Sequence, residues 1–314
     1  MTTSTAKDAS RAAAKRRLVV YLGVTFALTW VLDIGAGLAL GSFGHGEGAT
    51  PLIVAPIAIS MFFPLVGALV ANRASKPADR IDLCFRPFVR ENVRYYVAAW
   101  LIPAILSALG CILFFAVNPQ LFDPTFAGYL RTLEAAGGPA ASNMPSADEL
   151  ASAMPAMVAV TFVAAITVAP FLNAIPAFGE EAGWRGMLFP TLRELMSTRA
   201  AAIVSGIIWG VWHAPVIAMG HNYGMGYSGF PWAGIVVMTV ACTAFGLTLC
   251  YLRLHTQSVW PCALAHGALN AVANAGVVFC AAGQTLAGPS PLGYVAGIPM
   301  LLLGGYCFAK MPRE

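Results

Sequence analysis

Charged residues are scarce in this chain. Asp, Glu, Lys and Arg together make up 10% of its 314 residues, whereas a soluble globular domain carries about 25%. This scarcity excludes an ordinary soluble domain. Hydrophobic residues make up 58% of the chain instead. They are arranged in runs of about 20 residues, which is the length that a membrane-spanning helix needs.

Several sequence signatures are also missing. Short segments of alternating polarity are absent, which excludes a transmembrane β-barrel. The seven cysteines form no C-x-x-C and lie mostly inside apolar runs, so we interpret them as small buried hydrophobic residues rather than a disulfide or zinc-thiolate framework. The net charge of +4 comes from basic residues beside apolar runs, which gives no reason to expect nucleic acid as a partner.

The hydrophobic runs predict an all-α, polytopic membrane protein with about eight transmembrane helices. We expect a basic cytoplasmic tail at 1–17, without ordered structure, followed by a single transmembrane helical domain at 18–310. The predicted spans are 18–40, 51–72, 94–117, 155–178, 200–219, 231–252, 259–280 and 291–309.

The distribution of lysine and arginine predicts the orientation of these spans. Basic residues concentrate in cytoplasmic loops of membrane proteins. With the N-terminus inside the cell, of the 18 lysines and arginines only Arg131 lies outside. We therefore expect a cell (inner) membrane protein with both termini in the cytoplasm, and a long outer segment at 118–154 that holds at most one short helix.

Three polar groups interrupt the apolar sequence: Glu180-Glu181-x-x-x-Arg185, then His213, then His266-x-x-x-Asn270. An ionisable side chain at membrane depth costs roughly 2.5–3.5 kcal/mol or more. Such residues are therefore expected to face the interior of the bundle and to carry function. The other polar candidates, Asp33 and Asn173, are isolated, and we interpret them as buried hydrogen-bonding residues. His45, His221 and His255 fall in or beside loops, where we expect them to be solvated.

The spacing of the acidic group predicts two different roles. On a continuous helix Glu181 and Arg185 are four residues apart, acidic residue first, which favours an ion pair. Glu180 then points about 100° away and stays available as a base. The alternative is an interfacial charge cluster at the end of a span.

The two histidines have alternative interpretations as well. His213 lies among aromatic residues just before Pro215, which is expected to loosen the local backbone and shape a cavity, although it could also be a packing residue. His266 and Asn270 share one helix face. Together they could donate hydrogen bonds to a developing oxyanion, or they could clamp two helices together.

These three motifs resemble those of the CAAX protease and bacteriocin-processing (CPBP) family of intramembrane endopeptidases, whose prokaryotic members are often called Abi proteins. The resemblance covers about 165–280, within a core that we place at about 155–280. One departure is visible, because the second motif usually begins with Phe and this chain has Trp209, which keeps a large aromatic packing face.

The resemblance implies a membrane peptidase that acts on a membrane-associated or lipidated (CAAX-type) substrate. Glu180 and His213 would activate a water molecule, and His266 and Asn270 would stabilise the oxyanion. The family is often described as metalloproteases. A divalent metal such as zinc would here need Glu180, His213 and His266 as ligands, whereas the glutamate mechanism, which we favour, needs no cofactor.

Two other functions remain open on the sequence. The same polar cluster would suit a non-enzymatic bacteriocin-immunity or membrane-assembly protein, or an ion- or proton-coupled transporter. The absence of a recognisable internal repeat argues against a transporter. The expected partners are membrane lipid and a peptide or protein substrate, and the sequence carries no signal for an oligomeric state.

Overall fold

The computed structural model describes residues 3–43, 53–131 and 147–314. Within these ranges the regular structure is helical and no β-strand is present. The longer helices are α1 (Thr3–Ala39), α3 (Phe63–Ala74), α4 (Val93–Val117), α6 (Ala147–Thr167), α7 (Ala169–Gly183), α9 (Thr198–Trp212), α11 (Trp232–Thr256), α12 (Trp260–Val272) and α13 (Ile298–Lys310). The short helices are α2 (Val54–Ser60), α8 (Phe189–Arg193) and α10 (Ala214–Ala218).

Six helical segments of the described residues, some joined to a neighbouring turn, are long and apolar enough to cross a membrane. They are Asp8–Ala39, Val54–Ala74, Val93–Val117, Glu149–Thr167, Trp232–Thr256 and Trp260–Phe279. Two shorter apolar helices, α9 and α13, lie at the fifth and eighth predicted positions. The prediction of an all-α, polytopic membrane protein is confirmed.

The fourth predicted span, 155–178, is not one helix. It consists of the end of α6 and most of α7, with a break at Val168. Pro170 causes the break, because it has no N–H to donate to the carbonyl of Ile166 four residues earlier. The indole of Trp100 donates to that carbonyl instead, at 2.7 Å. The second half of the span is thus free to take its own direction.

The basic segment at 1–17 also differs from the expected disordered tail, because α1 is helical from Thr3 onward. Arg17, only 2% exposed, donates to Thr191 Oγ1 at 3.0 Å and to the carbonyl of Asp79 at 2.7 Å. It also forms an ion pair with Glu194. These contacts hold α1 at Arg17 against α8 and Asp79, where the end of a free tail is expected from the sequence.

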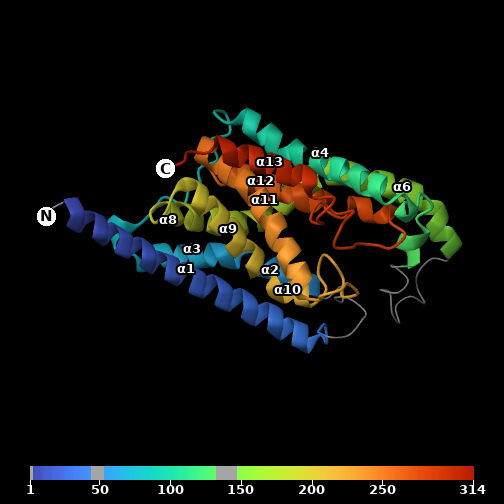
Figure 1. Cartoon of the computed structure of the whole chain (residues 1–314), viewed down its shortest axis with the longest axis horizontal. Coiled ribbons are helices and arrows are strands. Elements are labelled where there is room, and N and C mark those ends of the chain that lie inside the picture. Colours follow the sequence, from blue (N-terminus) through green and yellow to red (C-terminus); the bar gives the residue numbers. More distant parts are fainter. Residues whose placement is uncertain (1–2, 44–52, 132–146) are drawn as a thin grey trace.

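Helix α1 runs along one side of the bundle and α4 and α6 along the other, with α11 and α12 between them (Figure 1). Helix α7 packs against both α3 and α12, and α9 packs against α11. The two termini lie at the same end of the bundle (Figure 1). Of the outer segment predicted at 118–154, residues 132–146 lie outside the described ranges, and α6 already begins at Ala147.

The outer surface of the helices is apolar. Val31 of α1, Ile112 of α4 and Val160 of α6 are 74%, 66% and 70% exposed. Large apolar side chains on this scale are stable at a surface that faces lipid rather than water. Polar side chains are collected inside the bundle instead, around α7, α9 and α12.

Candidate functional site

The acidic motif lies at the end of α7 and continues into a π-helical turn, Trp184–Leu188. Turns of this kind widen a helix locally and often occur at functional sites. Glu180, Glu181 and Arg185 are 2%, 0% and 0% exposed. The motif is therefore inside the bundle, and the alternative of a solvated interfacial charge cluster is wrong.

Glu180 is held by two tryptophans. Its Oε2 atom accepts a hydrogen bond from Trp209 Nε1 at 2.7 Å and another from Trp184 Nε1 at 3.2 Å. Both donors are neutral indoles, so they orient the carboxylate without forming an ion pair with it. Its second oxygen, Oε1, is left for another partner.

Glu181 has a different set of partners. Its Oε1 atom accepts from Arg185 Nη1 at 3.0 Å, which confirms the predicted pair. The same oxygen lies 2.9 Å from His266 Nδ1. The guanidinium of Arg185 also stacks over the ring of Trp209, 4.5 Å from its centroid. Glu181 thus fixes the position of His266, and Arg185 fixes the position of Trp209.

His213 lies where α9 ends and α10 begins. Pro215 occupies the first turn of α10, where its missing N–H is tolerated, and the predicted loosening of the backbone is confirmed. His213 Nδ1 lies 2.9 Å from the carbonyl of Trp209. Because a carbonyl can only accept, Nδ1 carries the proton and a neutral His213 has its lone pair on Nε2.

Helix α12 brings His266 and Asn270 against α7 by close backbone approach. A Cβ on Gly267 would lie 2.7 Å from the carbonyl of Pro170 and 2.8 Å from Ala174 Cα, so only glycine fits there. This approach carries His266 to Glu181. Asn270 lies one turn further along the helix, with its side chain exposed to the interior space.

A cavity of about 310 Å³ connects these groups. Four of the six predicted site residues line it, and the other two lie directly behind its wall. The four are Glu180, His213, His266 and Asn270, and the two are Glu181 and Arg185. The structure therefore brings the three separate motifs of the sequence to one place.

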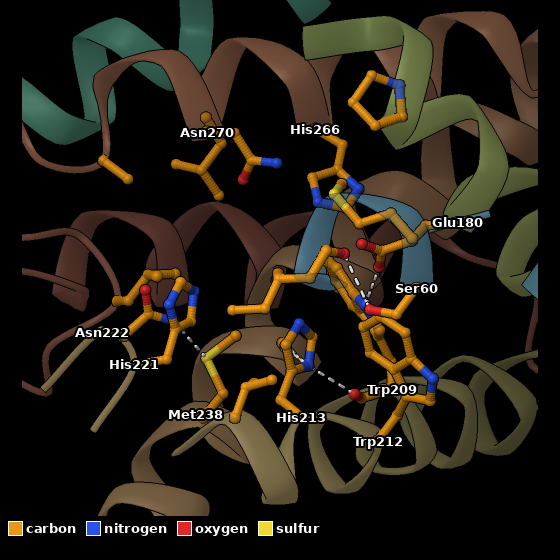
Figure 2. Close-up of a pocket in the computed structure, with 18 of the residues that line it drawn as sticks. Ser60, Glu180, Trp209, Trp212, His213, His221, Asn222, Met238, His266 and Asn270 are labelled. Atoms are coloured by element: carbon orange, nitrogen blue, oxygen red, sulfur yellow. Dashed lines mark hydrogen bonds between the residues drawn. The ribbon is translucent and has the colours of Figure 1, made fainter. Parts of the chain in front are cut away.

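The groups are distributed around this cavity rather than gathered at one point. Figure 2 shows Glu180 and His266 together on one side and His213 across from them. His221 and Asn222 lie at the far end. An extended ligand could therefore contact several of these groups at the same time.

The described part of the cavity wall contains two acids, Glu180 and Asp33, and no lysine or arginine. His221, expected to be solvated, is half-buried in the wall, and burial lowers its pKa to about 4. It is a neutral ring at neutral pH. His255, by contrast, is exposed as predicted, and His45 lies outside the described residues.

The three residues considered as metal ligands are not gathered at one point. Among residues 3–43, 53–131 and 147–314, no three His, Cys, Asp or Glu side chains are grouped as metal ligands. Figure 2 shows Glu180 beside His266, with His213 across the cavity from them. Glu180, His213 and His266 are therefore not grouped as a three-ligand set.

Several contributors were not predicted. The sequence predicts Trp209 only as an aromatic packing face and assigns no role to Trp184, yet both donate to Glu180. Asp33 was interpreted as an isolated buried residue, but it lines the cavity. The rule that intramembrane ionisable residues mark functional sites would have pointed to Asp33. No sequence signal identifies which acid a tryptophan will face.

The fold and the site define a multi-pass helical membrane protein with a carboxylate–histidine cavity inside its bundle. Residues 149–272 match the family described as Type II CAAX prenyl endopeptidase Rce1-like. Over 53 residues the chain is 42% identical to CAAX prenyl protease 2 of Methanococcus maripaludis, a stretch that covers 17% of this chain and 20% of the relative. The chain thus matches about a fifth of that relative's length. The match over residues 149–272 confirms the resemblance to CAAX endopeptidases that the three motifs predicted.

Proposed function

We propose that the chain is an intramembrane endopeptidase that hydrolyses peptide bonds with a glutamate-activated water molecule. The observation that carries this proposal is the cavity in which Glu180, His213, His266 and Asn270 meet. The family match over 149–272 supports it.

In the proposed reaction, Glu180 Oε1 and His213 Nε2 hold the attacking water. Glu180 takes a proton from this water as its oxygen bonds to the scissile carbonyl carbon. The carbonyl oxygen becomes an oxyanion. When the C–N bond breaks, the proton held by Glu180 passes to the leaving amine, so that atoms and charges balance.

The oxyanion would be stabilised by His266 and Asn270. Since His266 Nδ1 donates to Glu181, Nε2 can donate only when the ring is doubly protonated. Two carboxylates and the guanidinium of Arg185 leave one net negative charge, which favours an imidazolium at His266. The ion pair behind the cavity would thus keep His266 in its donating form.

The test is cleavage of peptides by the purified full-length protein in proteoliposomes. The name of the relative, CAAX prenyl protease 2, makes a prenylated CAAX peptide the first substrate, next to unmodified peptides. We expect Glu180→Gln and His213→Ala to abolish cleavage while the thermal unfolding of the protein is unchanged. Normal cleavage by both variants refutes the proposal.

The chain offers matched controls for both variants. Glu91 is an exposed acid outside the cavity, so Glu91→Gln repeats the chemical change without touching the site. His255 is exposed and its Nδ1 bonds the carbonyl of Tyr251 at 2.8 Å, the same local hydrogen bond that His213 makes. His255→Ala should therefore leave cleavage unchanged.

We also propose that the protein lies in the cell membrane with both termini in the cytoplasm. The common location of the two ends in the bundle supports this orientation (Figure 1). Reporter fusions at the C-terminus, one active only in the cytoplasm and one only outside, test it. Activity of the outer reporter alone would refute the orientation.

A further inference from the structure

Asp33 of α1 is a buried acid in the wall of the cavity. The residue is only 2% exposed, and its Oδ1 atom has no hydrogen-bond partner among the described residues. Glu180, the other acid in the wall, has two indole donors. The free oxygen of Glu180 is assigned above to the attacking water, whereas the buried Oδ1 atom of Asp33 has no role in that reaction.

The neighbouring donors are already used. Ser60 forms a side-chain hydrogen bond with the Asp33 carboxyl and also lies 2.9 Å from the carbonyl of Ile57, so that Oδ1 of Asp33 remains without a partner among the described residues. The indole of Trp30, about one turn before Asp33 on α1, donates to the carbonyl of Trp212. The indole of Trp212, on α9, donates to Thr29 Oγ1. Within the described ranges, the ion pairs do not include Asp33.

A buried carboxyl oxygen without a donor is unfavourable, and more so at membrane depth. A ligand that supplies an N–H group to this oxygen would recover the lost hydrogen bond. The described wall carries no lysine or arginine, and the imidazolium proposed at His266 is bound through Nδ1 to Glu181. The unpartnered oxygen of Asp33 is therefore complementary to a group that carries N–H.

We propose that Asp33 forms a substrate subsite that accepts a hydrogen bond from an N–H group of the bound peptide. This proposal rests on the proposed peptidase function and assigns one end of its cavity to substrate recognition. The N–H group can come from a basic side chain or from the main-chain amide of the peptide, and the two sources are separable by experiment.

The experiment uses a panel of fluorogenic peptides on a neutral alanine–leucine background. Each peptide carries one lysine at a successive position and has a norleucine twin, and a second set carries one N-methylated amide at each position. Cleavage and binding of all peptides are measured with the wild-type protein, Asp33→Asn and Asp8→Asn. Asp8 is an exposed acid on the same helix and is the matched control.

We expect one position at which lysine, or an unmethylated amide, is preferred by the wild-type protein and by Asp8→Asn. In Asp33→Asn a lysine preference should fall by about tenfold to a hundredfold, as for a lost hydrogen bond to a charged group, whereas an amide preference should fall less because the asparagine oxygen still accepts. A lysine effect identifies a side-chain donor, and an N-methyl effect identifies a main-chain donor. Cleavage of the preferred bond itself should continue.

Equal preferences in Asp33→Asn and the wild type at every position would overturn the subsite while leaving the peptidase intact. If the wild type cleaves no peptide, the peptidase proposal fails and the binding measurements decide on Asp33. Loss of peptide binding in Asp33→Asn then supports the subsite, and unchanged binding refutes it. A change in thermal unfolding alone would assign Asp33 to structure and also refute it.

Discussion

Replacing Trp209 with phenylalanine tests how Glu180 is held. The substitution keeps a large aromatic ring for packing and removes the Nε1–H that donates to Glu180 Oε2 at 2.7 Å. Phenylalanine is also the usual residue at this position in the family that the motifs resemble. If only the packing of the aromatic ring were important, Trp209→Phe would keep the activity of the wild type.

The size of the expected effect follows from the hydrogen bond. A bond to a charged group contributes about 1.5–3 kcal/mol, and each 1.4 kcal/mol is about a tenfold change in rate. We therefore expect kcat/KM of Trp209→Phe to fall by roughly 10- to 100-fold. Trp184→Phe, which removes a longer bond of 3.2 Å, should lose less.

Peptide cleavage in proteoliposomes measures the effect, and Trp212→Phe is the matched control. Trp212 lies on the same helix and also lines the cavity, but its indole donates to Thr29 and not to Glu180. Activity of Trp209→Phe equal to that of Trp212→Phe would refute the role assigned to the indole donor.

Three further predictions concern the support of the site. Arg185→Ala removes one member of a fully buried ion pair, which costs about 3–5 kcal/mol of stability. Thermal unfolding of this variant should therefore begin about 10 °C lower. Arg94 is exposed, so Arg94→Ala should not change the unfolding temperature. Gly267→Ala should lower both stability and cleavage because its Cβ meets α7, while Gly305→Ala, with open space around it, should change neither. Cleavage should persist in the presence of a metal chelator, since no three-ligand set is grouped in the described residues, and loss of cleavage restored by zinc would contradict this.

Much of the fold could be predicted because it depends on local sequence. A run of about 20 apolar residues reports a span whatever its neighbours are, and all eight predicted positions hold apolar helices. The pair of Glu181 and Arg185 was predictable for the same reason, because residues four apart on a helix are neighbours. The effect of Pro215 was predictable as well, because a proline changes the hydrogen bonding of the backbone at its own position.

The contacts between helices could not be predicted in this way. His266 bonds Glu181 across 85 positions of sequence, and Trp209 bonds Glu180 across 29. Both depend on the direction that α7 takes after the break before Pro170, and the contact of His266 also depends on the close approach permitted at Gly267. Neither the helix break nor the close approach of the helices produces a periodic pattern of residues in the sequence.

The two adjacent glutamates show why these contacts decide the chemistry. Neighbouring residues on a helix point about 100° apart, so Glu180 faces α9 and the cavity while Glu181 faces Arg185 and His266. The charge of Glu181 is balanced by its guanidinium partner. Glu180 accepts hydrogen bonds from neutral indoles, which orient its carboxylate without pairing its charge. The acid that keeps both its charge and a free oxygen in the cavity is the one able to take a proton from water, and its position beside its paired neighbour follows from the helix geometry alone.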